Sequence, residues 1–278
     1  MTWLGALLSF ICHDPSMTLC TPLCSRTYVS DISLSLRQDA WKQETAPILH
    51  RMSSQFHIST PLTADVARIA SIHVAAMDSN TLLHAQFPDP ETLGRLRTFL
   101  ENYLTNELTN PKAGILVARD AVTDEIVSYA KWDYPSSGGD DDKGKVETGD
   151  LRNMEGCRRE FLERYTALAE QAKKRAFGEG PCYHLAFVCT DPEFQRLGAG
   201  SLLTRHIMEK ARADGMVIYL ESTLDTVHMY ERLGFRKVDA FQMKIPRPGG
   251  DPEDLSGIYE EVCMVWWPNE TRSPGIPA

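Results

Sequence analysis

The sequence predicts a single α/β domain whose mixed sheet carries helices on both faces. Short apolar segments typical of strands recur along the chain, and segments with a 3.6-residue apolar period separate many of them. Some strand-like segments follow one another directly, as in hairpins, whereas a helical pattern separates others. Because hairpins and crossover units are mixed, the sheet should contain both antiparallel and parallel neighbours. The 278 residues, 42% apolar and 24% charged, suit one globular domain with extensions.

The first 54 residues differ from the rest. Residues 2–12 are apolar, but no Lys or Arg precedes them as in a secretory signal, and they are too short to span a bilayer. Residues 14–51 show little periodicity and much Ser and Thr. We expect residues 1–54 to be a poorly ordered extension that need not belong to the mature protein. The domain then covers residues 55–270, and residues 271–278 form a tail.

The first half of the domain is predicted to open with a strand and two helices. Asp89 is typical of a helix cap, and Pro90 suits the first helical position. The segment AVTD between two apolar runs predicts a hairpin. The predicted elements are a strand at 56–59, a helix at 65–77, a loop at 79–88, a helix at 89–110, and strands at 114–119 and 125–134.

The second half opens with residues 135–150, PSSGGDDDKGKVETGD, which are rich in Gly, Ser and Asp and predict a mobile insertion. A long amphipathic helix follows, ending in basic residues and Gly178, and should lie over the sheet or cover the site. The predicted elements are helix 153–177, strand 184–190, helix 197–214, strand 217–222, helix 226–233, and strands 236–244 and 260–266.

The turn QRLGAG, residues 195–200, lies between a strand and a helix and carries the first functional signal. It lacks the third glycine of the dinucleotide fingerprint and the Lys-Ser/Thr pair of a P-loop. The backbone N–H groups of residues 196–201 open a helix, where no preceding carbonyl pairs with them and the helix dipole is positive. Such a turn is suited to a pyrophosphate. Side chains at Gly198 or Gly200 would hold the phosphate away from these amides.

With its flanking segments, this turn resembles the GCN5-related N-acetyltransferases (GNAT), whose acetyl-CoA signature Q/R-x-x-G-x-G/A follows a strand. PEFQ precedes the glycines, LLTRHIMEKARADG follows them, and LEST and HMYERLGF come next in the expected order. The resemblance covers residues 56–267, is strongest over 184–238, and is greatest to fungal members of unassigned substrate. It implies a GNAT fold, with a mostly antiparallel sheet splayed at the cofactor cleft, and acetyl-CoA as co-substrate.

The resemblance also implies which residues contact the cofactor. Backbone groups of Val188, Cys189 and Thr190 would bind the pantetheine arm as an added strand would. Thr223 stands where many relatives carry an Asn that contacts the cofactor. The pyrophosphate segment would consist of Gln195, Arg196, Leu197, Gly198, Ala199, Gly200 and Ser201.

The catalytic roles implied are an acid and a base. Tyr230, in the position of the family's tyrosine, would protonate the leaving thiolate, a role that suits a phenol of pKa about 10. Glu221 is the first candidate base, because it ends the strand beside the acetyl group and burial could raise its pKa. His184 and His228 are alternatives, and Ala186 occupies the position where some relatives place a catalytic Glu. Tyr230 could instead be a core aromatic, and Glu221 an ion-pair partner.

The acceptor is expected to be a primary amine of a small molecule. Trp132 and Tyr134 would line its groove, or else be simply buried, and the loops 78–88 and 135–150 would form its walls. An acidic chain with aromatics near the groove favours a cationic amine. No His and acid stand at a recognisable spacing from Cys189, so we expect packing there and direct transfer in a ternary complex.

Composition limits the remaining possibilities. A net charge of -9 without a basic run argues against nucleic acid, and seven scattered cysteines without a CxxC pair argue against a metal site and for a reducing cytoplasm. No membrane partner is expected, and the protein should be a monomer or homodimer. The predicted activity is N-acetyl transfer, of the EC 2.3.1 type. The alternatives are a non-catalytic acyl-CoA sensor, suggested by Thr223 and Ala186, and an O-acyltransferase of secondary metabolism.

Overall fold

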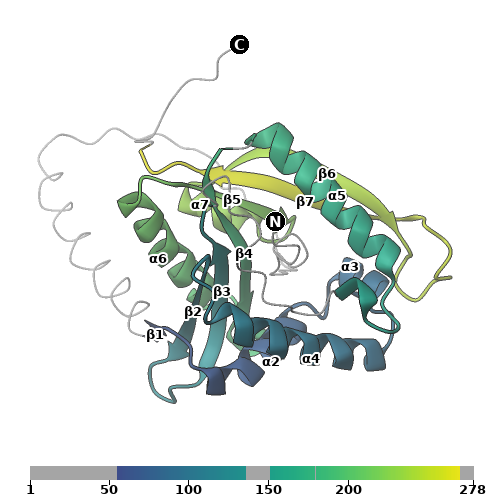
Figure 1. Cartoon of the computed structure of the whole chain (residues 1–278), viewed down its shortest axis with the longest axis horizontal. Helices are drawn as coiled ribbons and strands as arrows, with labels where there is room; N and C mark the ends of the chain where they lie inside the picture. The colour runs from purple at the N-terminus through teal and green to yellow at the C-terminus, as the bar shows by residue number, and fades with distance from the viewer. Residues whose placement is uncertain (1–54, 136–150, 179, 270–278) are drawn as a thin grey trace, which may run out of the picture.

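The computed structural model describes residues 55–135, 151–178 and 180–269, which form one seven-stranded sheet with helices on both faces (Figure 1). The strand order is β1-β2-β3-β4-β5-β7-β6, and every neighbouring pair is antiparallel except β4 and β5. The strands are β1 (Phe56–Ser59), β2 (Ala113–Asp120), β3 (Ile126–Asp133), β4 (Cys182–Thr190), β5 (Val217–Thr223), β6 (Arg236–Ile245) and β7 (Gly257–Trp266). The predicted mixed, mostly antiparallel α/β fold is confirmed.

Two apolar cores lie on opposite faces of the sheet. One core contains side chains of α6 and α7, and the other contains side chains of α2, α3, α4 and α5. The alternation along β4 divides its residues, so that Val188 packs on the α6 side while Phe187 and Cys189 pack on the other. The helices are α2 (Val66–Ala76), α3 (Thr81–Gln86), α4 (Pro90–Glu107), α5 (Arg159–Ala176), α6 (Ala199–Ala213) and α7 (Val227–Leu233).

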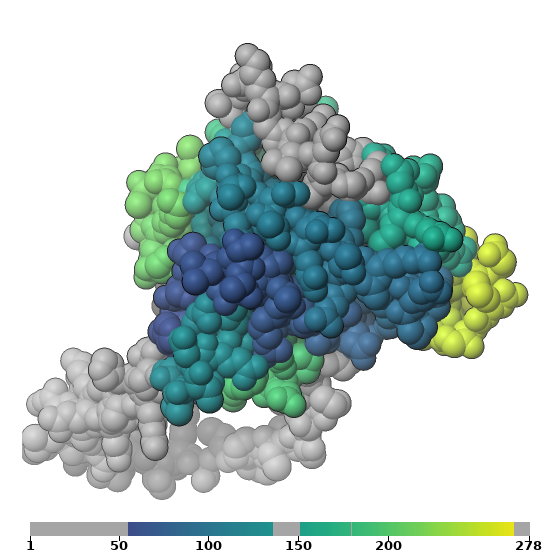
Figure 2. All heavy atoms as spheres, turned by 60° about the horizontal axis from the view of Figure 1, so that its bottom comes forward, coloured from purple at the N-terminus to yellow at the C-terminus, as the bar shows by residue number. Residues whose placement is uncertain are grey.

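On the face opposite α6, the helices α2, α3, α4 and α5 lie next to one another. In Figure 2, α2, α3 and α4 form one blue surface, which meets α5 and the yellow end of the β6–β7 hairpin. The backbone N–H of Arg158, just before α5, donates to the carbonyl of Gln86 at the end of α3 at 2.9 Å. Among the described helices, none is both long and apolar enough to cross a bilayer.

Three element predictions need correction. The loop expected over 79–88 contains α3, which the Asn80 side chain caps by accepting from the N–H of Leu83 at 2.9 Å. The long helix begins at Arg159 and not at 153, because the chain turns at Gly156 with φ +81°. Helix α6 begins at Ala199 rather than 197. The predictions for residues 1–54, 136–150 and 270–278 concern parts of the chain outside the described residues.

The parallel ladder in the middle of the sheet is short. Strands β4 and β5 pair only where residues 182–184 meet residues 217–219. Beyond the pair His184 and Tyr219, β4 stays paired with β3 and β5 stays paired with β7. The two strands therefore part at their carboxyl ends, on the side where the β4–α6 turn lies.

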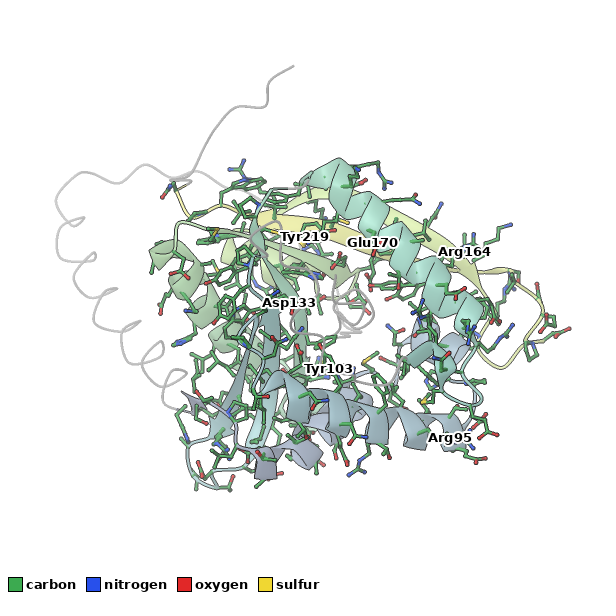
Figure 3. All side chains as sticks on the ribbon, in the orientation of Figure 1. Arg95, Tyr103, Asp133, Arg164, Glu170 and Tyr219 are labelled. Carbon is green, nitrogen blue, oxygen red and sulfur yellow. The ribbon has the colours of Figure 1, made fainter. Side chains whose placement is uncertain are left out.

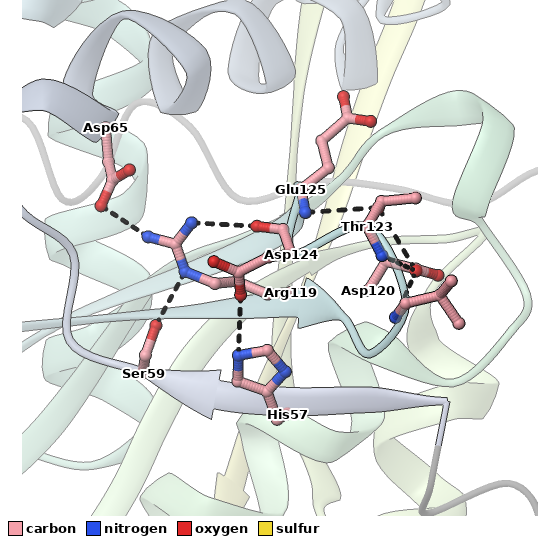
Figure 4. Close-up of polar contacts among 9 residues, drawn as sticks. His57, Ser59, Asp65, Arg119, Asp120, Thr123, Asp124 and Glu125 are labelled. Atoms are coloured by element: carbon pink, nitrogen blue, oxygen red, sulfur yellow. Dashed lines mark hydrogen bonds and ion pairs between the residues drawn. The ribbon is translucent and has the colours of Figure 1, made fainter.

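The other edge of the sheet is fastened by charged groups (Figure 4). Arg119 of β2 donates through its guanidinium to Asp65 at 2.7 Å, to Ser59 at 3.0 Å and to the carbonyl of Asp124 at 3.1 Å. His57 of β1 lies 3.1 Å from the Asp124 carboxylate. These contacts join edge strand β1 and the start of α2 to the β2–β3 hairpin.

Candidate active site

The β4–α6 turn directs backbone donors toward the gap between the strands. Gly198 (φ +96°) and Arg196 (φ +62°) are left-handed, and the first helical hydrogen bond runs from the N–H of Leu202 to the carbonyl of Gly198 at 2.9 Å. The amides of Ala199 and Gly200, like that of Ser201, therefore lie in the first turn, where a helix has no carbonyl to offer them. With the helix dipole behind them, they suit a phosphate group.

The two glycines of the turn have different physical roles. Gly198 is required by its backbone conformation, since an added Cβ would meet nothing within 4 Å. An added Cβ at Gly200 would instead lie 3.2 Å from Val188 Cγ1 and 3.4 Å from Thr190 Oγ1. Close packing of α6 on β4 thus explains Gly200, in contrast to the prediction that both glycines serve the approach of a phosphate.

Side chains next to the turn hold it in place. Asp191 accepts from the N–H of Glu193 at 3.0 Å and from the guanidinium of Arg68 on α2 at 2.8 Å. Gln195 donates its side-chain amide to the carbonyl of Thr190 at 3.2 Å, and Leu197 is exposed. The structure therefore gives the side chain of Gln195 a role in shaping the turn.

Only part of the predicted pantetheine strand presents free-edge backbone groups. The N–H of Asp191 donates to the carbonyl of Val127 on β3 at 2.8 Å, and hydrogen-bonded pairs alternate along an antiparallel ladder. Cys189 consequently directs its backbone groups at β3, whereas Val188 and Thr190 direct theirs at the edge facing β5. The predicted pantetheine contacts include all three residues, and the ladder separates Cys189 from the other two.

An imidazole and a carboxylate meet where β4 and β5 part. His184 Nε2 lies 2.7 Å from Glu221 Oε2, and both side chains are largely buried. His184 of β4 pairs with Tyr219 of β5 at the end of the parallel ladder. Glu221 lies two residues after Tyr219 on β5. The end of the parallel ladder thus brings together two of the predicted candidate bases as one hydrogen-bonded pair.

The pKa of Glu221 moves opposite to the expectation. Burial raises the pKa of this carboxyl, but the imidazole of His184, Lys173 and the Tyr219 hydroxyl together lower it below its usual value. Glu221 is therefore an anion that accepts hydrogen bonds, and it is a weaker proton acceptor than burial alone would make it. The expectation of a raised pKa overlooked the partner that β4 supplies.

Beside the His184–Glu221 pair lies a row of buried charged side chains from β3 and α4. Lys131, fully buried on β3, lies 2.5 Å from Asp133 Oδ1 and 3.0 Å from Glu107 Oε2 on α4. Burial opposes its charge, but nearby Tyr103, Asp133 and Glu107 on balance raise the pKa of Lys131. Asp133 Oδ2 faces His184 Nδ1 at 4.0 Å. In Figure 3, Asp133 lies between Tyr219 and Tyr103.

A second buried carboxyl on the same face was missed from sequence. Glu261 of β7 is fully buried, and the hydroxyls of Tyr165 and Tyr259 donate to its two oxygens at 2.6 Å each. Burial raises the pKa of Glu261 to about 8, although the two phenols lower it. The only sequence signal was an acidic residue at an inward position of an apolar strand.

The predicted acceptor aromatics lie on the wrong face for the His184–Glu221 pair. Trp132 is 3% exposed in the α6-side core, and its ring stands edge to face with Tyr134 at 5.9 Å. The ring lies against Gly114, where a Cβ would be 2.1 Å away. Strand alternation therefore places Trp132 in the α6-side core, and its role in lining the acceptor groove stays a prediction.

The other predicted residues lie around α7. Tyr230 is buried in the α6-side core, edge to face with Phe235 at 5.4 Å. The hydroxyl of Thr223 lies 3.2 Å from that of Thr226, the residue just before α7. His228 is exposed and pairs with Glu231 at 2.9 Å, so it does not reach the His184–Glu221 pair.

A buried thiol lies near the site but is not activated. Cys189 packs on the α2 side with its sulfur 3.9 Å from His73 Nδ1. Burial raises the pKa of Cys189 to about 12 and lowers the pKa of His73 to about 3. A thiolate and imidazolium pair is therefore unfavourable, which fits the expected packing role.

A sheet that splits beside a helix N-terminus offers backbone groups to an extended ligand and amides to its phosphates, as the coenzyme A of an acyltransferase requires. The family model described as "Acetyltransferase (GNAT) family" matches residues 80–235. The chain belongs to this family, and it is an acetyltransferase of the EC 2.3.1 type with acetyl-CoA as co-substrate. The glycine turn and the free edge of β4 fit that co-substrate.

Two solved structures illustrate the likeness. A histone acetyltransferase HPA2-related protein from Corynebacterium glutamicum is 23% identical, with a TM-score of 0.50, over 79% of this chain and 99% of that one. An agmatine N-acetyltransferase is 15% identical, with a TM-score of 0.51, over 77% of this chain and 99% of that one. These likenesses concern the fold. No protein of curated function matches the sequence.

Proposed function

We propose that this acetyltransferase moves the acetyl group directly to a primary amine of a small molecule in a ternary complex. The observation that carries the proposal is the 2.7 Å contact between His184 and Glu221 at the point where β4 and β5 part. An ammonium group must lose a proton before its nitrogen can attack a thioester. The bound acetyl-CoA supplies the activated acyl group, and this pair receives the proton.

Within the pair, we assign the base to His184. Glu221 engages Nε2, so the ring presents Nδ1 to an incoming proton, and the anionic carboxylate stabilises the imidazolium that results. This reverses the order of the sequence-based candidates, because the lowered pKa of Glu221 suits an orienting anion better than a base. Tyr230 keeps its proposed role as the acid that protonates the leaving thiolate.

The co-substrate is proposed to lie along the free edge of β4. Backbone groups of Val188 and Thr190 would hold the pantetheine arm, while the amides of Ala199, Gly200 and Ser201 would hold the pyrophosphate. The edge-facing backbone of β4 and the helix start of α6 support this placement. Because the hydroxyl of Thr223 contacts that of Thr226, we propose that Thr223 contacts the co-substrate through its backbone.

Direct transfer is favoured over an acyl-enzyme. The thiol on the predicted cofactor strand, that of Cys189, packs on the side opposite α6, and its raised pKa keeps it protonated. A cytoplasmic location, a monomer or homodimer, the absence of nucleic-acid and membrane partners, and the likeness to fungal members remain predictions.

The experiment is thiol release from acetyl-CoA with a panel of amines, alcohols and peptides. We expect release with small primary amines, and His184→Gln should lower kcat/KM by about 10²- to 10⁴-fold. The matched control is His228→Gln, a surface histidine that should leave the rate unchanged. Acetyl-CoA binding without any release would identify a sensor, and release with alcohols alone would identify an O-acyltransferase. An unchanged rate for His184→Gln would remove the base from this position.

A further inference from the structure

One oxygen in the row of buried charged side chains lacks a hydrogen-bond donor. Asp133 Oδ1 contacts Lys131 at 2.5 Å, but Oδ2 is buried, and no donor within the described part of the chain reaches it. Glu107, the other carboxylate beside Lys131, is better served, because the side-chain amide of Asn110 donates to it at 2.8 Å and the hydroxyl of Tyr103 at 3.3 Å. Leaving such an oxygen without a donor is costly, so a ligand that donates there would be stabilised.

The neighbour of this oxygen is the proposed base. Asp133 Oδ2 and His184 Nδ1 are 4.0 Å apart, too far for a hydrogen bond between them. A nitrogen beside this gap can lie within about 3 Å of both atoms. An ammonium there would donate one hydrogen to Asp133 and direct another at Nδ1. The oxygen that lacks a donor and the nitrogen that accepts the proton thus face one position.

Charge balance points to the same kind of ligand. The carboxylates of Glu107 and Asp133 both contact one buried lysine, Lys131, so this part of the cluster carries excess negative charge. A cation beside Asp133 would balance it. A carboxylate next to the reacting nitrogen would instead meet Asp133 and Glu221 at close range, where like charges repel strongly in a buried site.

Resting on the proposed function, we propose that Asp133 binds the ammonium group of the acceptor beside His184 and restricts acceptors to primary amines that carry no carboxylate on the adjacent carbon. Asp133 thus acts as a positioning and specificity residue. The sequence predicts that its neighbours Trp132 and Tyr134 line the acceptor groove, but the alternation of β3 turns Asp133 to the face of His184 and Glu221.

The test compares amines that differ only in a carboxylate, agmatine with arginine and tyramine with tyrosine. The wild-type enzyme should prefer the decarboxylated member of whichever pair it accepts. Asp133→Asn should raise the KM of that amine by about 10- to 100-fold, reduce the preference between the two members, and leave the KM of acetyl-CoA unchanged. Asp124→Asn, which removes an exposed carboxylate on the same hairpin, is the matched control. It should change neither the KM of the amine nor the preference between the two members.

Loss of Asp133 also leaves Lys131 with one partner fewer, so a second variant guards against misfolding. Lys131→Met combined with Asp133→Asn removes both charges and should show the same loss of preference. If the wild type acetylates amines but Asp133→Asn keeps the amine KM and the preference, this inference is wrong while the proposed function stands. If the wild type prefers arginine or tyrosine, the inference is wrong too. If acetyl-CoA binds and no amine is acetylated, both fail.

Discussion

Replacing Glu261 by Gln tests whether the raised pKa of this buried carboxyl makes the stability of the fold depend on pH. The Glu261 side chain has no exposed surface, and Tyr165 and Tyr259 donate to its two oxygens from α5 and from β7 itself. Its pKa is raised to about 8, because burial outweighs the two phenol hydrogen bonds and the nearby charge of Glu221 adds to the effect. The folded protein therefore holds this carboxyl in its neutral form at pH 7.

The size of the effect follows from the two pKa values. The ordinary pKa is 4.5, and the folded value is higher, so this group stabilises the fold fully below pH 4.5 and loses that contribution as pH rises to about 8. Each pH unit within this window removes about 1.4 kcal/mol from the free energy of unfolding. Between pH 4.5 and 7 the loss amounts to about 3 kcal/mol. A glutamine does not ionise, so Glu261→Gln should escape this loss.

The assay is urea unfolding followed by far-ultraviolet circular dichroism at intervals between pH 4.5 and 8.5. Relative to wild type, Glu261→Gln should gain about 3 kcal/mol in unfolding free energy on going from pH 4.5 to pH 7. Glu260→Gln is the control, since Glu260 is the exposed neighbour on the same strand. Parallel pH profiles for the two variants would show that Glu261 is already ionised in the fold and would refute the reasoning.

Three further predictions concern the site itself. Tyr230→Phe should lower kcat by about 10- to 1,000-fold with nearly unchanged acetyl-CoA affinity, measured by steady-state kinetics and calorimetry; an unaltered kcat would take the acid role from Tyr230. Gly198→Ala should cost about 1–2 kcal/mol because φ is +96°, seen as weaker coenzyme A binding or a lower Tm, whereas Gly94→Ala within α4 should be neutral or stabilising. Cys189→Ala should keep turnover within a few-fold, and intact-mass spectrometry of the wild type with acetyl-CoA alone should detect no acetylated enzyme; an acetyl adduct on Cys189 would contradict direct transfer.

Local patterns sufficed for most of the fold. Apolar periodicity, the Asp89 cap and the spacing of the glycine turn predicted the strands and most of the helices in their order along the chain. These signals depend on neighbours within a few residues. The same patterns failed for α3, because its six residues are too few to show a period. They also failed for the start of α5, because the chain turns at Gly156 before the helix begins at Arg159. The QRLGAG turn indicated the family because its residues are consecutive, although only Gly198 is explained by local backbone conformation and Gly200 by packing on β4.

The tertiary structure decided which side chains share the site. His184 and Glu221 stand 37 residues apart, and nothing near either one indicates that β4 and β5 part where they meet. The face taken by Trp132 and Asp133 depends on the register of β3 between its two neighbours, and the pKa of Glu221 depends on a partner from another strand. Sequence alone determined the class of enzyme, because a phosphate-binding turn is a local arrangement of amides. The proton acceptor and the acceptor site required the folded sheet, because hydrogen bonds and buried charge depend on distances that only packing sets.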